Sequence, residues 1–214
     1  MEDSYLHKGM RRQLVEEIRR KSITNEAVLK ALGAIPRHYF MDSSFLKIAY
    51  QDKAFPIGAG QTISQPYTVA FQTQLLDVKS MDKVLEVGTG SGYQTAVLLE
   101  LGARVFSIER QKELYAKSQR ILTQLGYHAQ FFYGDGYAGL PSYGPFDKIL
   151  VTAGAPEIPE KLPSQLKIGG IMVIPVGPDG KQIMTRIQRT GEEDYQITEH
   201  GNFSFVPLLK GTAS

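Results

Sequence analysis

Apolar residues near the start of the chain recur at three- and four-residue intervals, which is the spacing of one helix face. Over residues 10–21 they alternate with charged residues, and this pattern predicts an amphipathic helix. A second short helix is expected to begin at its cap, Thr24, and to end at Gly33. A third is expected to begin at Pro66, whose fixed φ suits a first helical position.

The middle of the chain alternates short apolar runs with helical patterns. The expected strands are residues 83–88, 103–109, 129–134, 146–153 and 170–177, and the expected helices are 93–101, 112–125 and 159–167. Short apolar strands separated by helices predict a parallel sheet covered on both faces. The expected fold class is therefore α/β, with a doubly wound, mostly parallel, Rossmann-like sheet that follows the N-terminal helices.

The last part of the chain has a different pattern. The segments "KQIMTRIQR" (181–189) and "DYQITEH" (194–200) resemble strands, and a Gly-Glu-Glu-Asp turn joins them. This arrangement predicts an antiparallel C-terminal extension of the sheet. The sequence does not indicate how the sheet is ordered beyond its fifth strand. Because no repeat or linker marks a boundary, we expect one domain over residues 1–214.

Charge and composition exclude several classes of protein. Lys and Arg number 24 against 22 Asp and Glu, a formal charge of +2, so no nucleic-acid partner is expected. There is no cysteine, which excludes disulfides and thiolate zinc sites and fits a cytoplasmic protein. The charged N-terminus and the lack of a long apolar run argue against a signal peptide and a membrane span.

The four histidines do not suggest a metal site. They are His7, His38, His128 and His200, and their spacings are unrelated. We therefore expect no metal and interpret His38 as a packing or hydrogen-bonded residue instead of a base.

Three glycines directly follow the first strand of the expected sheet. In "LEVGTGSGY" they are Gly88, Gly90 and Gly92, at the edge where open α/β sheets bind ligands. The alternative is an ordinary tight turn. Tyr93 occupies the position where the dinucleotide pattern has its third glycine, so a ligand without phosphates is favoured.

Acidic residues lie near this loop in the expected fold. Glu109 ends the second strand and could accept hydrogen bonds from both ribose hydroxyls, or it could be an exposed strand-end carboxylate. Asp135, in "GDG" (134–136), could accept an adenine amine, although such a residue is also common in turns. Glu86, inside the first strand, should meet a cationic or hydrogen-bonding partner such as a ligand α-amino group. A ribose, an adenine and an amino-acid end describe S-adenosylmethionine, and leave the methyl acceptor open.

The polar run "GQTISQP" (60–66) precedes the third expected helix and contains no cation. Local sequence alone favours Ser64 as a helix-capping or turn residue. A covalent nucleophile is a weaker alternative, because there is no G-x-S-x-G motif and no marked histidine partner.

Several motifs together resemble the protein-L-isoaspartate O-methyltransferase family over nearly the whole chain. They are "IPRHYF" (35–40), "AYQDKAFPIGAGQTISQPYTVA" (49–70), "VLEVGTGSGYQTAVL" (84–98), "SIER" (107–110), "GDG" (134–136), "GPFDKILVTAGAP" (144–156), "LKIGG" (166–170) and "FVPL" (205–208). The resemblance implies methyl transfer from S-adenosyl-L-methionine to the free α-carboxylate of L-isoaspartyl residues in damaged proteins and peptides. The ester then closes to a succinimide, which opens partly to aspartate.

The resemblance also implies roles for individual residues. Gly88, Gly90 and Gly92 would hold the methionine end of the cofactor, Glu109 its ribose, and Asp135 with Gly136 its adenine. Thr62, Ile63 and Ser64 would line the reaction centre, with Ser64 as the active-site position. Gln65 and the run Val206, Pro207 and Leu208 would contact the acceptor. The implied division is an N-terminal substrate-side segment (1–66), a cofactor-binding core (67–180) and C-terminal strands (181–214). The first 30 residues are the least diagnostic part.

The implied chemistry gives Ser64 a third interpretation. A carboxylate acceptor is already anionic at neutral pH, so it needs orientation and exclusion of water more than a strong base. Binding this carboxylate too strongly would stabilise the ground state more than the transition state. The Ser64 hydroxyl would aim the carboxylate, and free N–H groups at a helix start near Pro66 would add a mild positive potential. A methyltransferase for another acceptor and a non-catalytic binding module are the competing hypotheses.

Overall fold

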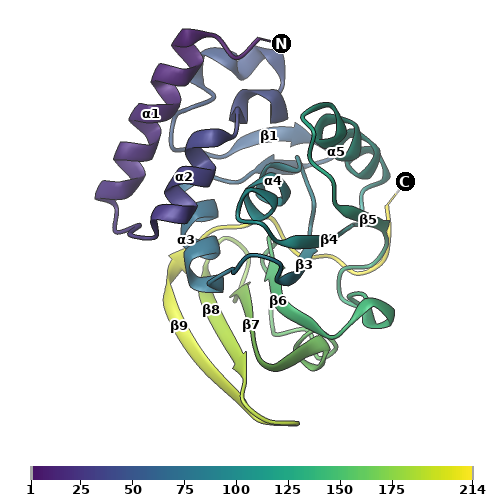
Figure 1. Ribbon diagram of the computed structural model, residues 1–214. Coiled ribbons are helices and arrows are strands. Elements are labelled where there is room, and N and C mark those ends of the chain that lie inside the picture. The colour runs from purple at the N-terminus through teal and green to yellow at the C-terminus, as the bar shows by residue number, and fades with distance from the viewer. Residues whose placement is uncertain (1, 214) are drawn as a thin grey trace.

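A central seven-stranded sheet positions the glycine loop (Figure 1). The structure is a computed structural model that describes residues 2–213. The strands of the sheet are β3 (Lys83–Val87), β4 (Arg104–Glu109), β5 (Gln130–Tyr133), β6 (Phe146–Val151), β7 (Leu166–Val176), β8 (Gln182–Arg189) and β9 (Tyr195–Phe203). Their order is β5-β4-β3-β6-β7-β8-β9, with parallel pairs as far as β7 and antiparallel pairs beyond it. The predicted fold class and the antiparallel extension are confirmed.

The strand order creates a switch point next to the glycine loop. From β3 the chain continues outward through β4 to β5, then returns to the other side of β3 and continues through β6 to β7. Ligands of open α/β sheets bind at the carboxyl ends of the strands on either side of such a reversal. The loop that follows β3 is therefore where the topology predicts a ligand.

Five α-helices are described, and they pack on one face of the sheet. They are α1 (Tyr5–Arg20), α2 (Glu26–Ala34), α3 (Pro66–Leu76), α4 (Tyr93–Glu100) and α5 (Lys112–Gln124). On this face Val84 and Val105 pack against Leu76 of α3 and Leu98 of α4. Helices α1, α2 and α5 extend the same layer through a second cluster of buried apolar residues that includes Tyr93 of α4.

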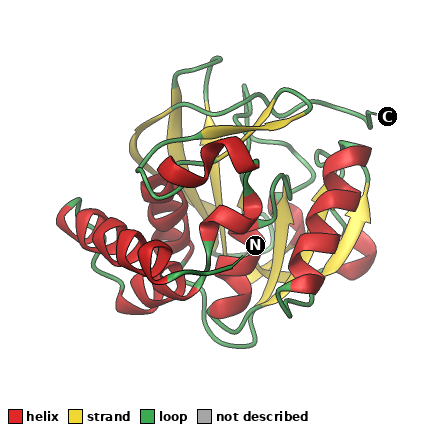
Figure 2. Cartoon of the chain, turned by 90° about the horizontal axis from the view of Figure 1, so that it is seen from above, coloured by secondary structure: helices red, strands yellow, loops and turns green. Residues whose placement is uncertain are grey.

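The opposite face of the sheet is covered by loops and short 3₁₀ turns. Leu85, Phe106 and Ile149 pack there against Leu140 and Leu162, which lie between strands. Figure 2 shows, from above, loops crossing the molecule on the side away from the helices. Both faces are thus covered, but α-helices supply only one of the covers.

The helix expected at 159–167 is wrong. The segment contains a 3₁₀ turn (Pro163–Gln165), and β7 already begins at Leu166. Two prolines, Pro159 and Pro163, lie in the segment, and each lacks an N–H donor and disfavours helical backbone in the residue before it. This loss of local hydrogen bonding outweighs the apolar spacing of the segment.

The start of α2 also differs from the expectation. Its cap is Asn25, whose side chain accepts hydrogen bonds from the backbone N–H of Ala27 and Val28. Thr24 instead donates its backbone N–H to Gln74, and Gly33 lies inside the helix. The third helix begins at Pro66, as predicted.

A small hairpin before α3 was not predicted. It consists of β1 (Phe55–Gly58) and β2 (Gln61–Ile63), which pair antiparallel. Strands of three and four residues are too short for periodicity to reveal. The hairpin delivers Ile63 and Ser64 to the carboxyl edge of the main sheet. Over residues 2–213, every helix is too short or too polar to cross a bilayer.

Candidate functional site

A cavity lies at the carboxyl ends of β3 and β4, and it encloses about 790 Å³, part of it open to solvent. Ten of the residues predicted for the site line it, namely Thr62, Ile63, Ser64, Gly88, Gly90, Glu109, Gly136, Val206, Pro207 and Leu208. The structure therefore brings together residues from five separate parts of the chain.

The first two glycines of the loop form part of the cavity wall. Gly88 has φ +96°, and a Cβ there would lie 2.5 Å from Thr152 Oγ1, so a side chain is excluded by both conformation and space. The Thr152 hydroxyl in turn donates to the Gly88 carbonyl at 2.6 Å. Gly90 donates its N–H to Glu109 Oε2 at 2.8 Å. These bonds hold the loop against the carboxyl ends of β4 and β6, the two strands on either side of β3.

The third glycine has a different environment from the one predicted. Gly92 precedes α4 with φ +88°, and a Cβ there would lie 2.9 Å from Leu122 Cδ1 of α5. It is absent from the cavity wall. The structure therefore explains Gly92 by the close approach of α4 and α5.

Glu109 is a buried carboxylate at the wall of the cavity. Its residue is 5% exposed, and its oxygens accept from Gly90 N and from Gln111 N, each at 2.8 Å. These two backbone donors fix the orientation of the carboxylate. Each oxygen keeps a further lone pair that can accept a ligand hydroxyl. The alternative of an exposed strand-end carboxylate is wrong.

The two residues predicted to hold adenine have different positions. Gly136 lines the cavity, and a Cβ there would lie 2.5 Å from Val87 Cγ1, so its packing against Val87 excludes a side chain. Asp135 is half-buried outside the cavity wall, and its Oδ1 accepts from Tyr137 N at 2.9 Å. This bond is the turn role that the sequence also allowed. The other Asp135 oxygen has no partner among the described residues.

Glu86 is absent from the cavity wall and has hydrogen-bonding partners inside the protein. It is fully buried beneath the loop, where its Oε2 accepts from the hydroxyls of Thr95 at 2.5 Å and Ser107 at 2.6 Å. Burial raises the pKa of this carboxyl to about 7, against the lowering effect of the two hydroxyls. Two neutral donors thus satisfy Oε2, whereas Oε1 is buried and has no hydrogen-bond partner among the described residues.

Ser64 lies where the cavity meets a neighbouring groove. Four residues line both spaces, namely Thr62, Ser64, Thr152 and Val206. Gln65 lines the groove only. The Ser64 hydroxyl makes no hydrogen bond with any described residue, and the cap position of α3 is Gln65, without a side-chain cap. The helix-capping interpretation of Ser64 is therefore wrong.

The first backbone N–H group of α3 is not free to interact with the methyl acceptor, contrary to our expectation. Pro66 has no N–H, and Tyr67 N donates to Asp52 Oδ1 at 2.7 Å. Asp52 thus provides the cap from a segment 15 residues earlier. The positive potential expected at this helix start is offset by a carboxylate.

Backbone bonds hold the run 206–208 against the end of β6. Gly154 N donates to Val206 O at 2.8 Å, and Leu208 N donates to Gly154 O at 2.7 Å. This short bridge places the run beside the cavity. Sequence reasoning missed Thr152, which lines the cavity, and Asp52, which caps α3. Thr152 is the first polar residue after the apolar run of β6, and that position was a detectable signal.

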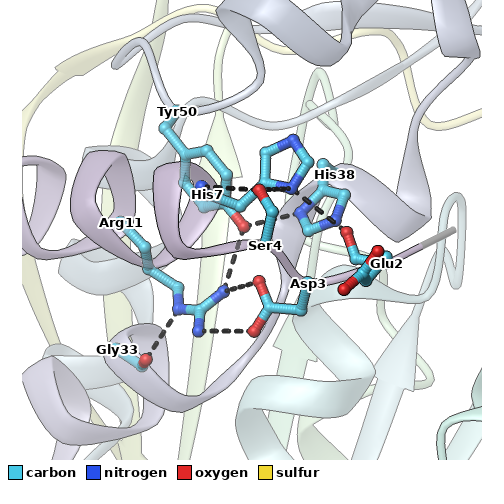
Figure 3. Close-up of polar contacts among 8 residues, drawn as sticks. All are labelled: Glu2, Asp3, Ser4, His7, Arg11, Gly33, His38 and Tyr50. Atoms are coloured by element: carbon cyan, nitrogen blue, oxygen red, sulfur yellow. Dashed lines mark hydrogen bonds and ion pairs between the residues drawn. The ribbon is translucent and has the colours of Figure 1, made fainter.

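A second polar cluster lies at the N-terminus, away from the cavity wall (Figure 3). Arg11 donates from its two Nη atoms to the two oxygens of Asp3, each at 3.0 Å. The rings of His7 and His38 stack at 3.9 Å, and Tyr50 lies 2.7 Å from His38 Nδ1. Burial, followed by the neighbouring His7, lowers the pKa of His38 to about 4.

This cluster is a poor metal site. Ligand atoms of Asp3, His7 and His38 lie within 4.8 Å of one another, but the two rings are inclined by only 22°. Imidazole lone pairs lie in the ring plane, so nearly parallel stacked rings cannot both point at one ion. Asp3 is also engaged by Arg11. The geometry is that of a neutral packing cluster.

The fold and the cavity together define a class of protein. They describe a Rossmann-like α/β protein with a site for an adenosyl ligand at its switch point and an open groove beside it. In this class, known as the class I methyltransferases, the groove would receive the methyl acceptor. Comparisons with known proteins identify the family within this class.

The family model described as "Protein-L-isoaspartate(D-aspartate) O-methyltransferase (PCMT)" matches residues 9–213. A protein-L-isoaspartate O-methyltransferase from Christiangramia forsetii is 61% identical over 211 residues, which cover 98% of this chain and 99% of the relative. One from Flavobacterium psychrophilum has the same identity and coverage. The chain therefore belongs to the protein-L-isoaspartate O-methyltransferase family, and the resemblance found in the sequence is confirmed.

Solved structures agree with this assignment. A putative protein-L-isoaspartate O-methyltransferase from Plasmodium falciparum, in complex with S-adenosyl-L-homocysteine, has a TM-score of 0.81 and 25% identity, over 94% of this chain and 98% of that one. Another protein-L-isoaspartate O-methyltransferase has a TM-score of 0.82 and 27% identity over 92% of this chain. This chain spans 65% of the length of that protein.

Proposed function

We propose that this chain is a repair methyltransferase that transfers a methyl group from S-adenosyl-L-methionine to the free α-carboxylate of L-isoaspartyl residues in damaged proteins and peptides. The observation that carries the proposal is the position of Ser64. Its hydroxyl, which has no partner among residues 2–213, lies at the junction between the cavity and an open groove. Membership of the family over nearly the whole chain supports the same activity.

The cavity wall fits the cofactor. The Glu109 carboxylate can accept the ribose hydroxyls, and Gly136, without a side chain, lines the cavity where the adenine ring would lie. Gly88 and Gly90 expose backbone to the methionine end, and Ile63 with Thr62 covers it from the hairpin. When bound, S-adenosylmethionine supplies an electrophilic methyl group on a positively charged sulfur. We assign Gly92, Glu86 and Asp135 indirect roles in supporting this wall.

The junction suits an anionic acceptor that must be oriented without being bound strongly in the ground state. None of the four residues shared by the cavity and the groove carries a charge. Arg110 also lines the cavity, but it follows Glu109 and donates to Gly211 O at 3.2 Å. The Ser64 hydroxyl can donate one hydrogen bond to the isoaspartyl carboxylate. A neutral donor orients the carboxylate with less ground-state stabilisation than a cation would give.

The groove supplies the contacts for the rest of the acceptor. Gln65 and Val206 line it at the junction, and the Pro207 and Leu208 backbone continues along the cavity rim. We further propose that residues 1–66 form the substrate side, 67–180 the cofactor core and 181–214 the C-terminal strands. Action on proteins in the cytoplasm, and not on nucleic acid, membranes or metals, is compatible with the formal charge of +2 and the cysteine-free sequence.

A pair of peptides that differ only at one residue tests this function. The protein is incubated with cofactor carrying a labelled methyl group and either an isoaspartyl peptide or the matching aspartyl peptide. The expected result is a labelled methyl ester on the isoaspartyl peptide alone. Equal labelling of both peptides would favour a methyltransferase with another acceptor. Cofactor binding without turnover on any isoaspartyl peptide would favour a binding module.

A further inference from the structure

Asp52 is a buried carboxylate that connects three segments of the chain. Its side chain is 3% exposed. Oδ1 accepts from Tyr67 N at 2.7 Å, and Oδ2 accepts from Gln65 Nε2 at 3.0 Å and from Lys21 Nζ at 2.8 Å. The donors come from the start of α3, from the residue before it and from the end of α1. None of the proposed functional roles described above uses this carboxylate.

The bonds of Asp52 surround the proposed catalytic serine without touching it. Ser64 is directly followed by Gln65, and Tyr67 is the second residue of α3. The Ser64 hydroxyl has no partner of its own within the described chain, so only the path of its backbone sets its position. Two of the donors bound by Asp52 lie within three residues of Ser64. A movement of Asp52 would therefore move the turn that carries Ser64.

An ordinary cap would not need this arrangement. A Ser, Asn or Asp at position 65 would cap α3 locally, whereas Gln65 makes no cap with its side chain. The cap instead comes from position 52, so the helix start is tied to the segment that precedes β1. Burial of a carboxylate is unfavourable unless hydrogen bonds and a counter-charge offset it. Asp52 has two hydrogen bonds to the turn and one ion pair with Lys21.

We propose that Asp52 is a positioning residue for the methyl transfer: it fixes the turn at residues 64–67 so that the Ser64 hydroxyl faces the junction. This inference rests on the proposed function of Ser64. Asp52 also occupies the first free amide of α3. The acceptor carboxylate therefore meets the single Ser64 hydroxyl and not the end of a helix, which would hold it more tightly in the ground state.

Variants at Asp52 are compared in the isoaspartyl peptide assay at saturating cofactor. Asp52→Ala is expected to lower kcat about 10- to 100-fold, as expected for the loss of one well-aimed hydrogen bond to a charged group. The Kd for the cofactor should stay within about twofold, since the glycine loop and Glu109 are untouched. Asp52→Asn should restore most of kcat, because its amide can still accept from Tyr67 N and can bond a flipped Gln65.

A double-mutant cycle separates positioning from a purely structural role. If Asp52 acts through Ser64, Asp52→Ala should lower kcat by less than about threefold in a Ser64→Ala background. Lys21→Met is the matched control, because it removes the ion pair and leaves both hydrogen bonds to the turn. It should retain kcat within about threefold, as is usual for a partly exposed pair.

Several results would overturn the inference. They are an unchanged kcat for Asp52→Ala, full additivity with Ser64→Ala, or a loss confined to cofactor affinity. If Asp52→Ala does not fold, Gln65→Met serves in its place, since it removes one of the two bonds to the turn and keeps the cap on Tyr67. Equal kcat for Gln65→Met and the parent would then count against Asp52. An inactive parent would overturn the proposed function itself, so the two failures are distinguishable.

Discussion

The two sides of the site are built in different ways. On the cofactor side, Gly88, Gly90 and Glu109 follow directly from two neighbouring strands, whose register pairs Val87 with Ile108. On the acceptor side, Ser64 is placed by Asp52, and the junction is completed by residues that follow β6 and β9. The first side is a product of sheet register, and the second depends on bonds between distant segments.

This difference predicts how each side responds to change. Sheet register is fixed by many backbone hydrogen bonds, so a substitution on the cofactor side should alter ligand contacts without displacing the wall. A substitution on the acceptor side should alter the orientation of the Ser64 hydroxyl. Substitutions on the cofactor side should therefore change the Kd for the cofactor, and substitutions on the acceptor side should change kcat. The predictions below test that division, beginning with the largest effect.

Removal of the Glu109 carboxylate should have the largest effect. Glu109→Ala removes the acceptor for both ribose hydroxyls and frees Gly90 N, and each lost charged hydrogen bond is worth about 1.5–3 kcal/mol. The Kd for S-adenosylmethionine or S-adenosylhomocysteine, measured by calorimetry, should rise about 10²- to 10⁴-fold. Glu109→Gln, which keeps one acceptor, should lose less. A Kd unchanged by either variant would remove Glu109 from the cofactor site.

Acid should weaken the N-terminal cluster around His38, which lies outside the cavity wall. The pKa of His38 in the fold is lowered to about 4 by burial and by His7, so the unfolded chain binds more protons between that value and the ordinary one near 6.5. Stability is therefore complete above about pH 6.5 and falls as the pH drops toward 4. The charged neighbours Asp3 and Arg11 largely neutralise each other.

Urea unfolding at several pH values measures this effect. Between pH 7 and pH 4.5 the His38 contribution should lower the free energy of unfolding by about 2 kcal/mol. His38→Gln is the control, since it keeps polar groups in the cluster but does not titrate. The parent should lose about 2 kcal/mol more than this variant over that range. Parallel losses in both proteins would show that the pKa of His38 is not lowered in the fold.

Substitution of Glu86 should have the smallest effect, and this effect should be confined to the stability of the fold. Its pKa in the fold is raised to about 7 by burial, so the unfolded chain releases its proton first as the pH rises from 4.5. Glu86 therefore destabilises the fold increasingly up to about pH 7. Glu86→Gln should gain about 1 kcal/mol relative to the parent between pH 6 and pH 8. The Kd of this variant for the cofactor should stay within about threefold of the parent's. A large loss of cofactor affinity would show that Glu86 contacts the ligand.

The same contrast explains which features the sequence predicts. The parallel strands, the glycine loop and Glu109 follow from apolar runs and from the polar residues at their ends. Gly92 and Asp135 lie outside the cavity wall, because the same spacing serves a cavity wall, helix packing or a turn. The segment 159–167 does not form the expected helix, because its prolines outweigh its apolar spacing.

Long-range contacts account for the features that the sequence does not predict. The bond between Asp52 and Tyr67 spans 15 residues, and the one that joins Gly154 to Val206 spans more than 50. Neither contact leaves a periodic signal. The hydroxyl of Ser64 has a clear role only after the structure shows that Asp52 supplies the cap.

One variant tests the separation of the two sides most directly. Ser64→Ala is measured for cofactor Kd and for kcat on the isoaspartyl peptide with the same preparation, and Ser64→Thr, which keeps a hydroxyl, serves as the control. The expected result is a kcat reduced about 10- to 100-fold with a Kd within about twofold of the parent. A fall in cofactor affinity that accounts for the lost activity, or an unchanged kcat, would contradict the account.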